Sequence, residues 1–279
     1  MKNLFSPFNL PTVLLLIFTV FMAGCQTIPW PWISNENNLQ QSQPDISLIK
    51  KRYDSDQQHR RAIPANWQIQ GVLDVEHPEL GRRSRLSIIK TPDQQISLRL
   101  YGLFQQVAFD LRVDPVWLQL IQPHSREIIR LQSTRAGLAY LTGYNLDPQQ
   151  LPHLFLGQAA PLSTRPKQIE QGLFTSTQEG EHLLLDAKTG RIEQRWQNDE
   201  QGMLYEVRYQ WPIPEKNHPY SLPERVSISL EKDNLTINFL FRKWLFPEPG
   251  HAFKLPQLPK GFQMIQPQFE PMNDGHGSS

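Results

Sequence analysis

Short segments in which apolar and polar residues alternate with a period of two recur along most of this chain. In the longest of them, Trp67, Ile69, Gly71, Leu73 and Val75 occupy every second position. A period of two places alternate side chains on the same face of a strand, so these segments predict half-buried β-strands. Similar alternation marks residues 96–100, 107–113, 203–209, 226–230 and 235–241, with shorter candidates at 85–90, 117–122, 126–131, 182–186 and 191–197.

The connections between these segments are short, and this determines how the strands pair. Turn-forming residues separate several of them, as at 186–190 and 231–234. A parallel crossover needs a dozen or more residues, so antiparallel hairpins are predicted. A sheet of ten or eleven strands must curl or be covered. We therefore expect a mainly β fold (α+β), a half-open antiparallel β-barrel of about ten or eleven strands with helices covering the concave side.

Two segments follow helical rules instead. Residues 45–61 predict a polar helix that begins near Asp45 or Ser47, carries an apolar stripe and ends before Pro64. Residues 148–156 predict a second helix, because Asp147 can cap it, Pro148 suits its first position and Gly157 can end it. Pro152 weakens this second helix, because it lacks a backbone donor.

The N-terminus has the parts of a bacterial secretory signal. Lys2 precedes an apolar run at 13–23, and Met22-Ala23-Gly24 leads into Cys25, the only cysteine of the chain. The run is shorter than the roughly 20 residues of a membrane-spanning helix. The alternative is an ordinary signal peptide that happens to contain a cysteine.

The segment around Cys25 resembles the lipobox of bacterial lipoproteins, with Met22 in place of the more frequent leucine. The resemblance implies cleavage before Cys25 and a covalent diacylglycerol and acyl chain, such as palmitate, on it. Gln26 rather than aspartate follows, which by the same resemblance implies sorting to the outer membrane, facing the periplasm. We expect a signal peptide at 1–24, a lipid-anchored flexible tether at 25–44, one domain at 45–265 and a disordered tail at 266–279.

Composition and motifs argue against several functional classes. The formal net charge is +1, so no electrostatic footprint for nucleic acid is visible. With Cys25 acylated, no thiol remains for a disulfide or for catalysis. The eight histidines form no metal-spaced pair, and neither a nucleophile elbow nor a phosphate-binding glycine loop occurs. We expect no catalytic residue, no metal, no cofactor and no enzymatic activity, and a monomeric protein.

The order of several short motifs carries a more specific resemblance. The strand from Trp67 to Val75 is followed by Tyr101-Gly102-Leu103-Phe104, by Leu151-x-x-Leu154-x-Leu156-Gly157, by Asp186-x-x-x-Gly190-x-Ile192 and by Leu235-x-Ile237. Over residues 45–262 this order resembles the LolB outer-membrane lipoprotein receptor family and the wider LolA/LolB-like superfamily of lipoprotein carriers. The resemblance implies an unclosed barrel, lined by hydrophobic side chains and lidded by helices, that accepts acyl chains.

The resemblance also assigns roles to residues of this chain. It implies a membrane-insertion loop at Leu103 and Phe104, although Gly102 replaces the family's proline and Phe104 its glycine. It implies lipid acyl chains and the membrane as partners, with a periplasmic lipoprotein carrier and client lipoproteins. Alternation of the strands then suggests a cavity lining, although residues of this kind are individually more often ordinary core, so the prediction concerns the inward apolar surface as a whole. The eight lining residues are Trp67, Ile69, Leu98, Leu100, Val107, Phe109, Tyr205 and Val207.

The leading prediction is therefore an outer-membrane lipoprotein that binds acyl chains in a hydrophobic cavity and takes part in lipoprotein or other lipid receipt and insertion. The alternative is a non-enzymatic envelope assembly lipoprotein that uses the same scaffold for contacts between proteins. Arg82, Arg83 and Arg85 cluster in the sequence, where they could contact lipid headgroups or an acidic carrier, or form a solvated hairpin tip.

Overall fold

The computed structural model describes residues 45–77, 82–143, 146–169, 172–199, 202–212, 221–230 and 235–267. The chain divides into two compact units, Met1–Gln43 and Pro44–Ser279. The first unit, with the predicted signal peptide, tether and Cys25, lies outside the described residues, as do residues 268–279 of the predicted tail. The second unit contains the hydrophobic core, and a unit with its own core is able to fold alone.

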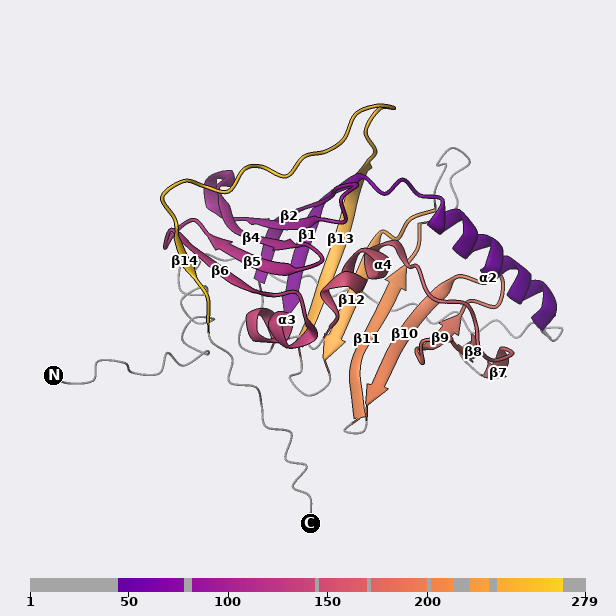
Figure 1. The fold of residues 1–279 in the computed structure, drawn as a ribbon. Helices are drawn as coiled ribbons and strands as arrows, with labels where there is room; N and C mark the ends of the chain where they lie inside the picture. Colours follow the sequence, from indigo (N-terminus) through magenta and orange to yellow (C-terminus); the bar gives the residue numbers. More distant parts are fainter. Residues whose placement is uncertain are drawn as a thin grey trace, which may run out of the picture. The chain divides into compact units, whose positions relative to one another are not determined.

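The described strands form one open, curled sheet of 14 strands (Figure 1). Its order is β14-β6-β5-β4-β3-β2-β1-β13-β12-β11-β10-β9-β8-β7, and every described pairing is antiparallel except that of β14 with β6. The strands are β1 (Trp67–Glu76), β2 (Arg82–Lys90), β3 (Ile96–Tyr101), β4 (Val107–Val113), β5 (Trp117–Gln122), β6 (Glu127–Gln132), β7 (Lys167–Ile169), β8 (Gly172–Ser176), β9 (His182–Leu185), β10 (Ile192–Asp199), β11 (Gly202–Gln210), β12 (Arg225–Leu230), β13 (Leu235–Leu245) and β14 (Gln263–Ile265).

The prediction of a mainly β fold built on a curled antiparallel sheet is confirmed, but the predicted count of ten or eleven strands was too low. Each of the eleven predicted segments is a strand, and β7, β8 and β14 are additional. β7 and β14 have three residues each, which is too short to display a period. In β8 the buried positions are Leu173 and Thr175, so one of its two inward residues is polar and the alternation of apolar and polar residues is lost.

The register aligns the apolar rows of neighbouring strands on the inner face. Ile69 of β1 lies opposite Ile88 of β2, and Leu100 of β3 lies opposite Phe109 of β4. Between β1 and β13 the register shifts next to Gly71. A Cβ at Gly71 would come within 2.2 Å of the Leu240 carbonyl oxygen, so the sheet can approach this closely only at a glycine.

The predicted N-terminal helix is confirmed as α2 (Ile46–Arg61), which Asp45 caps by accepting from the amide of Ser47. It packs through Ile49 and Tyr53 onto the turn that ends at Gly190. Gly190 has φ +73°, and a Cβ there would lie 2.9 Å from the Tyr53 amide nitrogen. This turn therefore needs glycine both for its left-handed backbone and for its contact with α2.

The second predicted helix is present, but as two pieces, the 3₁₀ turn η2 (Pro148–Gln150) and α4 (Leu151–Leu156). Pro152 cannot donate to the Pro148 carbonyl, and the Leu151 amide donates to that carbonyl instead, which tightens the first turn. Helix α3 (Arg135–Thr142) was not predicted. Thr134 caps it by accepting from the Gly137 amide, and Gly143 ends it at φ +80°.

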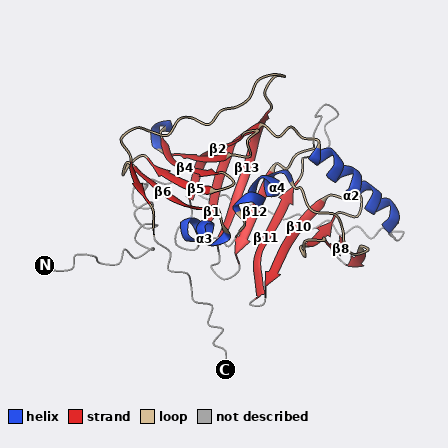
Figure 2. Cartoon of the chain, in the orientation of Figure 1, coloured by secondary structure: helices blue, strands red, loops and turns tan. Residues whose placement is uncertain are grey.

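Helices α3 and α4 lie across one face of the sheet (Figure 2). The buried core contains α4 residues together with the inward residues of β1, β12 and β13. After β13 the chain crosses to the far edge of the sheet, where β14 pairs with β6 and the Gln263 amide donates to the Arg126 carbonyl at 2.9 Å (Figure 1). Because α3 and α4 lie across the concave face, that face is covered by helices, as expected.

Candidate functional site

Helix α4 packs against the concave face of the sheet. Its apolar residues Leu151, Leu154, Phe155 and Leu156 are all buried. The ring of Phe155 packs edge-on to Phe239 of β13, with centroids 5.0 Å apart, and to Phe241 at 5.9 Å. We call this six-residue helix the α4 plug, because it covers the apolar surface that the sheet would otherwise expose.

A row of side-chain hydrogen bonds holds the segment that follows the plug. Five consecutive carbonyls, those of residues 156–160, each accept from a different side chain, and we call this arrangement the carbonyl latch. The pairs are Arg60 Nη1 to Leu156 O (2.7 Å), Gln57 Nε2 to Gly157 O (3.2 Å), Arg195 Nη1 to Gln158 O (2.7 Å), Arg61 Nη2 to Ala159 O (3.3 Å) and Tyr53 OH to Ala160 O (3.0 Å). Four donors belong to α2 and the fifth, Arg195, belongs to β10, so the end of the plug is fixed both to this helix and to the sheet.

Beneath the latch lies a buried ion pair. The guanidinium of Arg195, only 1% exposed, donates to Glu181, whose Oε1 also accepts from the Tyr205 hydroxyl at 3.0 Å. Burial raises the pKa of the Tyr205 hydroxyl, which therefore remains a proton donor at neutral pH. Among the described residues, Glu181 Oε2 and Arg195 Nε have no hydrogen-bond partner. Removal of either member would leave the other charge buried without a partner, so the stability of the fold depends on both.

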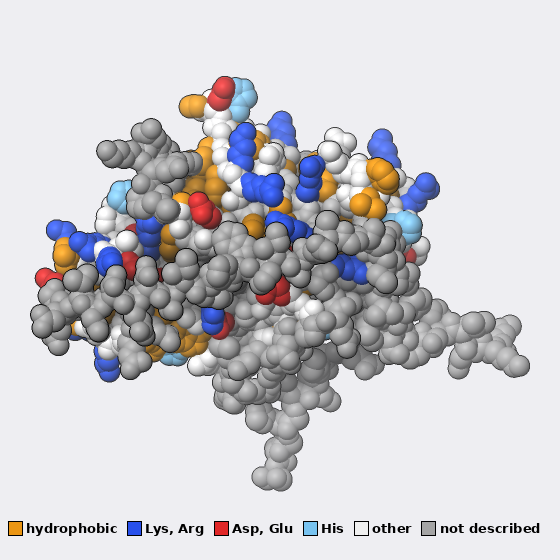
Figure 3. All heavy atoms as spheres, turned by 180° about the vertical axis from the view of Figure 1, so that it is seen from behind, with side chains coloured by type: hydrophobic (Ala, Val, Ile, Leu, Met, Phe, Trp, Pro, Cys, Tyr) orange, Lys and Arg blue, Asp and Glu red, His pale blue; other side chains and the backbone are white. Residues whose placement is uncertain are grey.

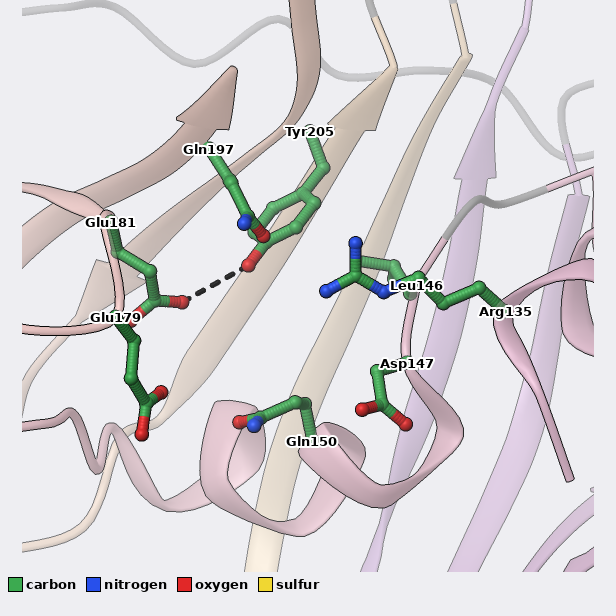
Figure 4. Close-up of a pocket in the computed structure, with 8 residues that line it drawn as sticks. All are labelled: Arg135, Leu146, Asp147, Gln150, Glu179, Glu181, Gln197 and Tyr205. Atoms are coloured by element: carbon green, nitrogen blue, oxygen red, sulfur yellow. Dashed lines mark hydrogen bonds between the residues drawn. The ribbon is translucent and has the colours of Figure 1, made fainter. Parts of the chain in front are cut away.

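A small cavity opens between this ion pair and the helices (Figure 4). Its volume is about 60 Å³, whereas sites for drug-sized ligands measure roughly 300–1,000 Å³. Figure 4 shows Arg135, Asp147 and Gln150 facing Glu181 and Tyr205 across it. The cavity is therefore polar and too small for an acyl chain.

The eight residues predicted to line a cavity are divided by the structure into two groups. Trp67, Ile69, Tyr205 and Val207 are buried in the core. Leu98, Leu100, Val107 and Phe109, from β3 and β4, are partly buried. Of the eight, only Tyr205 borders the small polar cavity.

The predicted membrane-insertion loop forms the 3₁₀ turn η1 (Leu103–Gln105) between β3 and β4. Leu103 is 54% exposed and Phe104 is 93% exposed. Phe104 and Gln105 have φ values of +60° and +62°, and the Gly102 amide closes the turn by donating to Gln106 at 2.9 Å. Phe104, not Leu103, is therefore the more exposed residue of the turn.

The latch donors and the buried ion pair were not predicted, although the sequence contains a signal for each. Ile49, Tyr53, Gln57 and Arg60 follow the helical spacing of i, i+4, i+8 and i+11, so two polar residues continue an apolar stripe. Arg195 occupies an inward position of β10, opposite Val207. A polar residue on a buried face requires a partner, and that requirement was the available clue.

The described residues lack the features of two other kinds of site. No group of three or more His, Cys, Asp or Glu side chains could hold a metal ion in that part of the chain. None of its helices has both the length and the hydrophobicity that a membrane span requires.

Comparison with known proteins identifies the family. The sequence model described as "Outer membrane lipoprotein LolB" matches residues 65–244, which is more than half of the chain. The chain belongs to the LolB family. The match runs from just before β1 to near the end of β13, so it includes the α4 plug, the latch carbonyls and η1 of this LolB-family chain.

Solved structures resemble this LolB-family chain in fold at low sequence identity. A DUF1329 family protein from Desulfovibrio piger is 7% identical with a TM-score of 0.52, over 74% of this chain and 95% of that one. A LolA superfamily protein from Nitrosomonas europaea is 11% identical with a TM-score of 0.48, over 76% of this chain and 94% of that one. A search of curated proteins finds no match.

Proposed function

We propose that this protein is an outer-membrane lipoprotein, anchored through Cys25, that receives acyl chains on the concave face of its sheet and passes them into the membrane. The observation that carries the proposal is the α4 plug: a six-residue helix packs all four of its apolar side chains into the apolar surface of the sheet. Membership of the LolB family supports a lipoprotein-related role. The donor would be a soluble carrier, and the cargo a client lipoprotein.

The plug is suited to displacement. Isolated helices shorter than about 12 residues are marginal in water, and Pro152 weakens this one further. The two latch hydrogen bonds from neutral donors contribute a net 0.5–1.5 kcal/mol or so each, and those from the three guanidinium groups up to about 1.5–3 kcal/mol each. A 16-carbon acyl chain that leaves water gains about 12 kcal/mol, at about 0.8 kcal/mol per methylene. Displacing the plug exposes its four buried apolar side chains, at a cost of about 1.5–3 kcal/mol each. Acyl chains that take their place on the inner face, where Trp67, Ile69 and Val207 lie among the covered residues, would offset that cost.

The tip of η1 would deliver the chains. Leu103 and Phe104 are exposed on a closed turn rather than packed in the core. An exposed aromatic side chain gains free energy in the membrane interface. Neither step makes or breaks a covalent bond, so the role requires no catalytic residue or cofactor.

One observation favours the alternative, an assembly lipoprotein that binds other envelope proteins. The cavity beside the helices is polar and measures about 60 Å³, so the interior is occupied by this chain's own side chains. If the plug never leaves, the protein would act through its outer surfaces alone.

Tyr53→Phe separates these two functions. The variant keeps the packed ring but removes the hydroxyl that donates to Ala160, so the latch should weaken by about 1 kcal/mol. If the open state is the one that binds, a larger open fraction raises apparent affinity in proportion, here about fivefold. We expect residues 44–279 carrying Tyr53→Phe to take up a fluorescent fatty acid about fivefold more tightly, as measured by fluorescence titration.

Ser227→Ala is the matched control, because it removes one hydroxyl donor, to Asn238, far from the latch on the outer face of β12. It should leave uptake unchanged. Absence of uptake by the parent chain and by both variants would favour the assembly role.

A further inference from the structure

We infer that the rim of the sheet around η1, formed by the ends of its strands, is a binding surface for anionic lipid headgroups. In it, Arg83, Arg85 and Arg126 flank the apolar tip formed by Leu103 and Phe104. The inference rests on the proposed function, in that the tip enters a membrane, and it adds the class of lipid that the tip meets. We call these five residues the headgroup edge.

The strand register places the arginines on both sides of the tip. Arg85 of β2 lies opposite Tyr101, the last residue of β3 before η1, and Arg83 lies two positions closer to the preceding turn. On the other side of the tip, η1 leads into β4, and β4 pairs with β5. Arg126 belongs to the turn that follows β5 and leads into β6. Neighbouring strands are about 4.8 Å apart, so the arginines bracket η1 within roughly two strand spacings.

The three arginines are exposed, and among the described residues none of them pairs with a carboxylate. Asp74 lies opposite Arg83 in the register, but the two side chains form no ion pair. Farther from the edge the situation differs, because Arg99 and Arg112 both bind Asp110 at 3.0 Å. The arginines within the sheet are therefore neutralised by a carboxylate, whereas no described carboxylate neutralises the three arginines beside the tip.

The space-filling view agrees with this arrangement. The turn η1, at the upper left of Figure 1, lies at the upper right of the reversed view in Figure 3. There, orange hydrophobic side chains lie beside blue Lys and Arg side chains. An apolar tip within a basic surround is the pattern expected of a surface that binds acidic membranes.

Both turns of the headgroup edge are held in fixed backbone conformations. Four described residues other than glycine have a positive φ, and three of them are Phe104, Gln105 and Arg126. Such conformations cost of order 1 kcal/mol or more and persist where neighbouring structure maintains them. Here the Gly102 amide closes η1, and the amide of Gln263 in β14 binds the Arg126 carbonyl. The strand β14 thus positions one of the arginines.

A membrane fits this surface better than a protein partner does. Stable protein interfaces bury about 800 Å² on each side, and two exposed apolar side chains on a narrow turn provide far less. A bilayer needs no complementary groove. It accepts the aromatic ring at the headgroup level while each nearby Arg adds about fivefold to the affinity for an anionic surface.

The test uses residues 44–279, which lack the proposed lipid anchor, in sedimentation with vesicles. Vesicles of phosphatidylcholine alone are compared with vesicles that contain phosphatidylglycerol as well. We expect the parent chain to prefer the anionic vesicles and to lose that preference in high salt. The triple variant Arg83→Gln/Arg85→Gln/Arg126→Gln should bind anionic vesicles about 100-fold more weakly. The matched control is Lys51→Gln/Arg242→Gln/Lys243→Gln, three exposed basic residues away from this edge, which should bind as the parent does.

Equal binding of the parent chain to both vesicle types, or parent-like binding by the triple variant, would overturn the inference. Parent-like vesicle binding combined with impaired acceptance from an acidic carrier protein would assign the arginines to that carrier instead and would also overturn it. Fatty-acid uptake is measured on the same samples. The arginine variants should retain it, so a failure here is distinguishable from a failure of the proposed function, in which uptake itself is absent.

Discussion

Arg195→Met is expected to lower the free energy of unfolding of residues 44–279 by about 3–5 kcal/mol, because it leaves Glu181 charged and buried without its cation. The guanidinium is almost completely buried and also donates to the latch carbonyl of Gln158. Methionine fills much of the same volume, so the loss should come from electrostatics and hydrogen bonding rather than from a cavity. Urea unfolding followed by circular dichroism measures it.

Two further variants test the cause of this loss. Arg195→Met/Glu181→Leu removes both charges and should recover the part of the loss that comes from the unpaired charge. The Tyr205 hydroxyl without its acceptor and the Gln158 carbonyl without its donor should still cost about 1–3 kcal/mol each. Arg208→Met breaks a comparable pair with Glu206, but Arg208 is 67% exposed, so it should cost less than about 1 kcal/mol. Equal losses in Arg195→Met and Arg208→Met would show that burial is not the source of the effect.

Phe104→Glu is expected to abolish most delivery of acyl cargo to membranes while leaving the fold intact. The side chain is 93% exposed, so its replacement should change stability by no more than about 0.5 kcal/mol. Transfer of a phenyl ring into the membrane is worth about 1.5–3 kcal/mol, so membrane binding should weaken at least tenfold. Leu103→Glu should have a smaller effect, because Leu103 is 54% exposed. Transfer of a labelled lipopeptide to vesicles provides the measurement.

The matched control is Val116→Glu. Val116 is 59% exposed and lies in the turn between β4 and β5, at the opposite end of these strands from η1. The same charge is therefore introduced at a comparable exposed apolar site that the proposal does not use. Normal delivery by Phe104→Glu, or an equal loss in Val116→Glu, would remove η1 from the mechanism.

The sequence predicts the long strands and the ends of α2 because these features are local. Alternation over five or more residues marks β1 and β13, and Asp45 marks the start of α2. Helix α3 escapes prediction because it has only eight residues and one of them is Gly137, a poor helix former. A Cβ at Gly137 would lie 2.3 Å from the Gln132 carbonyl oxygen, so close packing requires the glycine. Tertiary packing rather than intrinsic propensity therefore accounts for this helix.

The candidate site is predicted in part. The plug helix is predicted from Asp147, Pro148 and Gly157, which lie at the two ends of one short segment of the chain. The polar residues on the inward stripe of α2 indicate that buried partners exist, but the sequence does not show which ones, because the partners are far apart; Gln57 and Gly157, for example, are 100 residues apart. The alternating pattern predicts an apolar inner face, but it does not indicate whether a helix or a ligand covers that face.

Hydrogen exchange of residues 148–160, with and without a triacylated lipopeptide bound to residues 44–279, tests displacement of the α4 plug most directly. We predict that amides of α4 and the latch segment lose protection when the lipopeptide binds, while those of β1 and β13 remain protected. Binding that leaves residues 148–160 fully protected would contradict displacement of the plug, and so would the absence of binding.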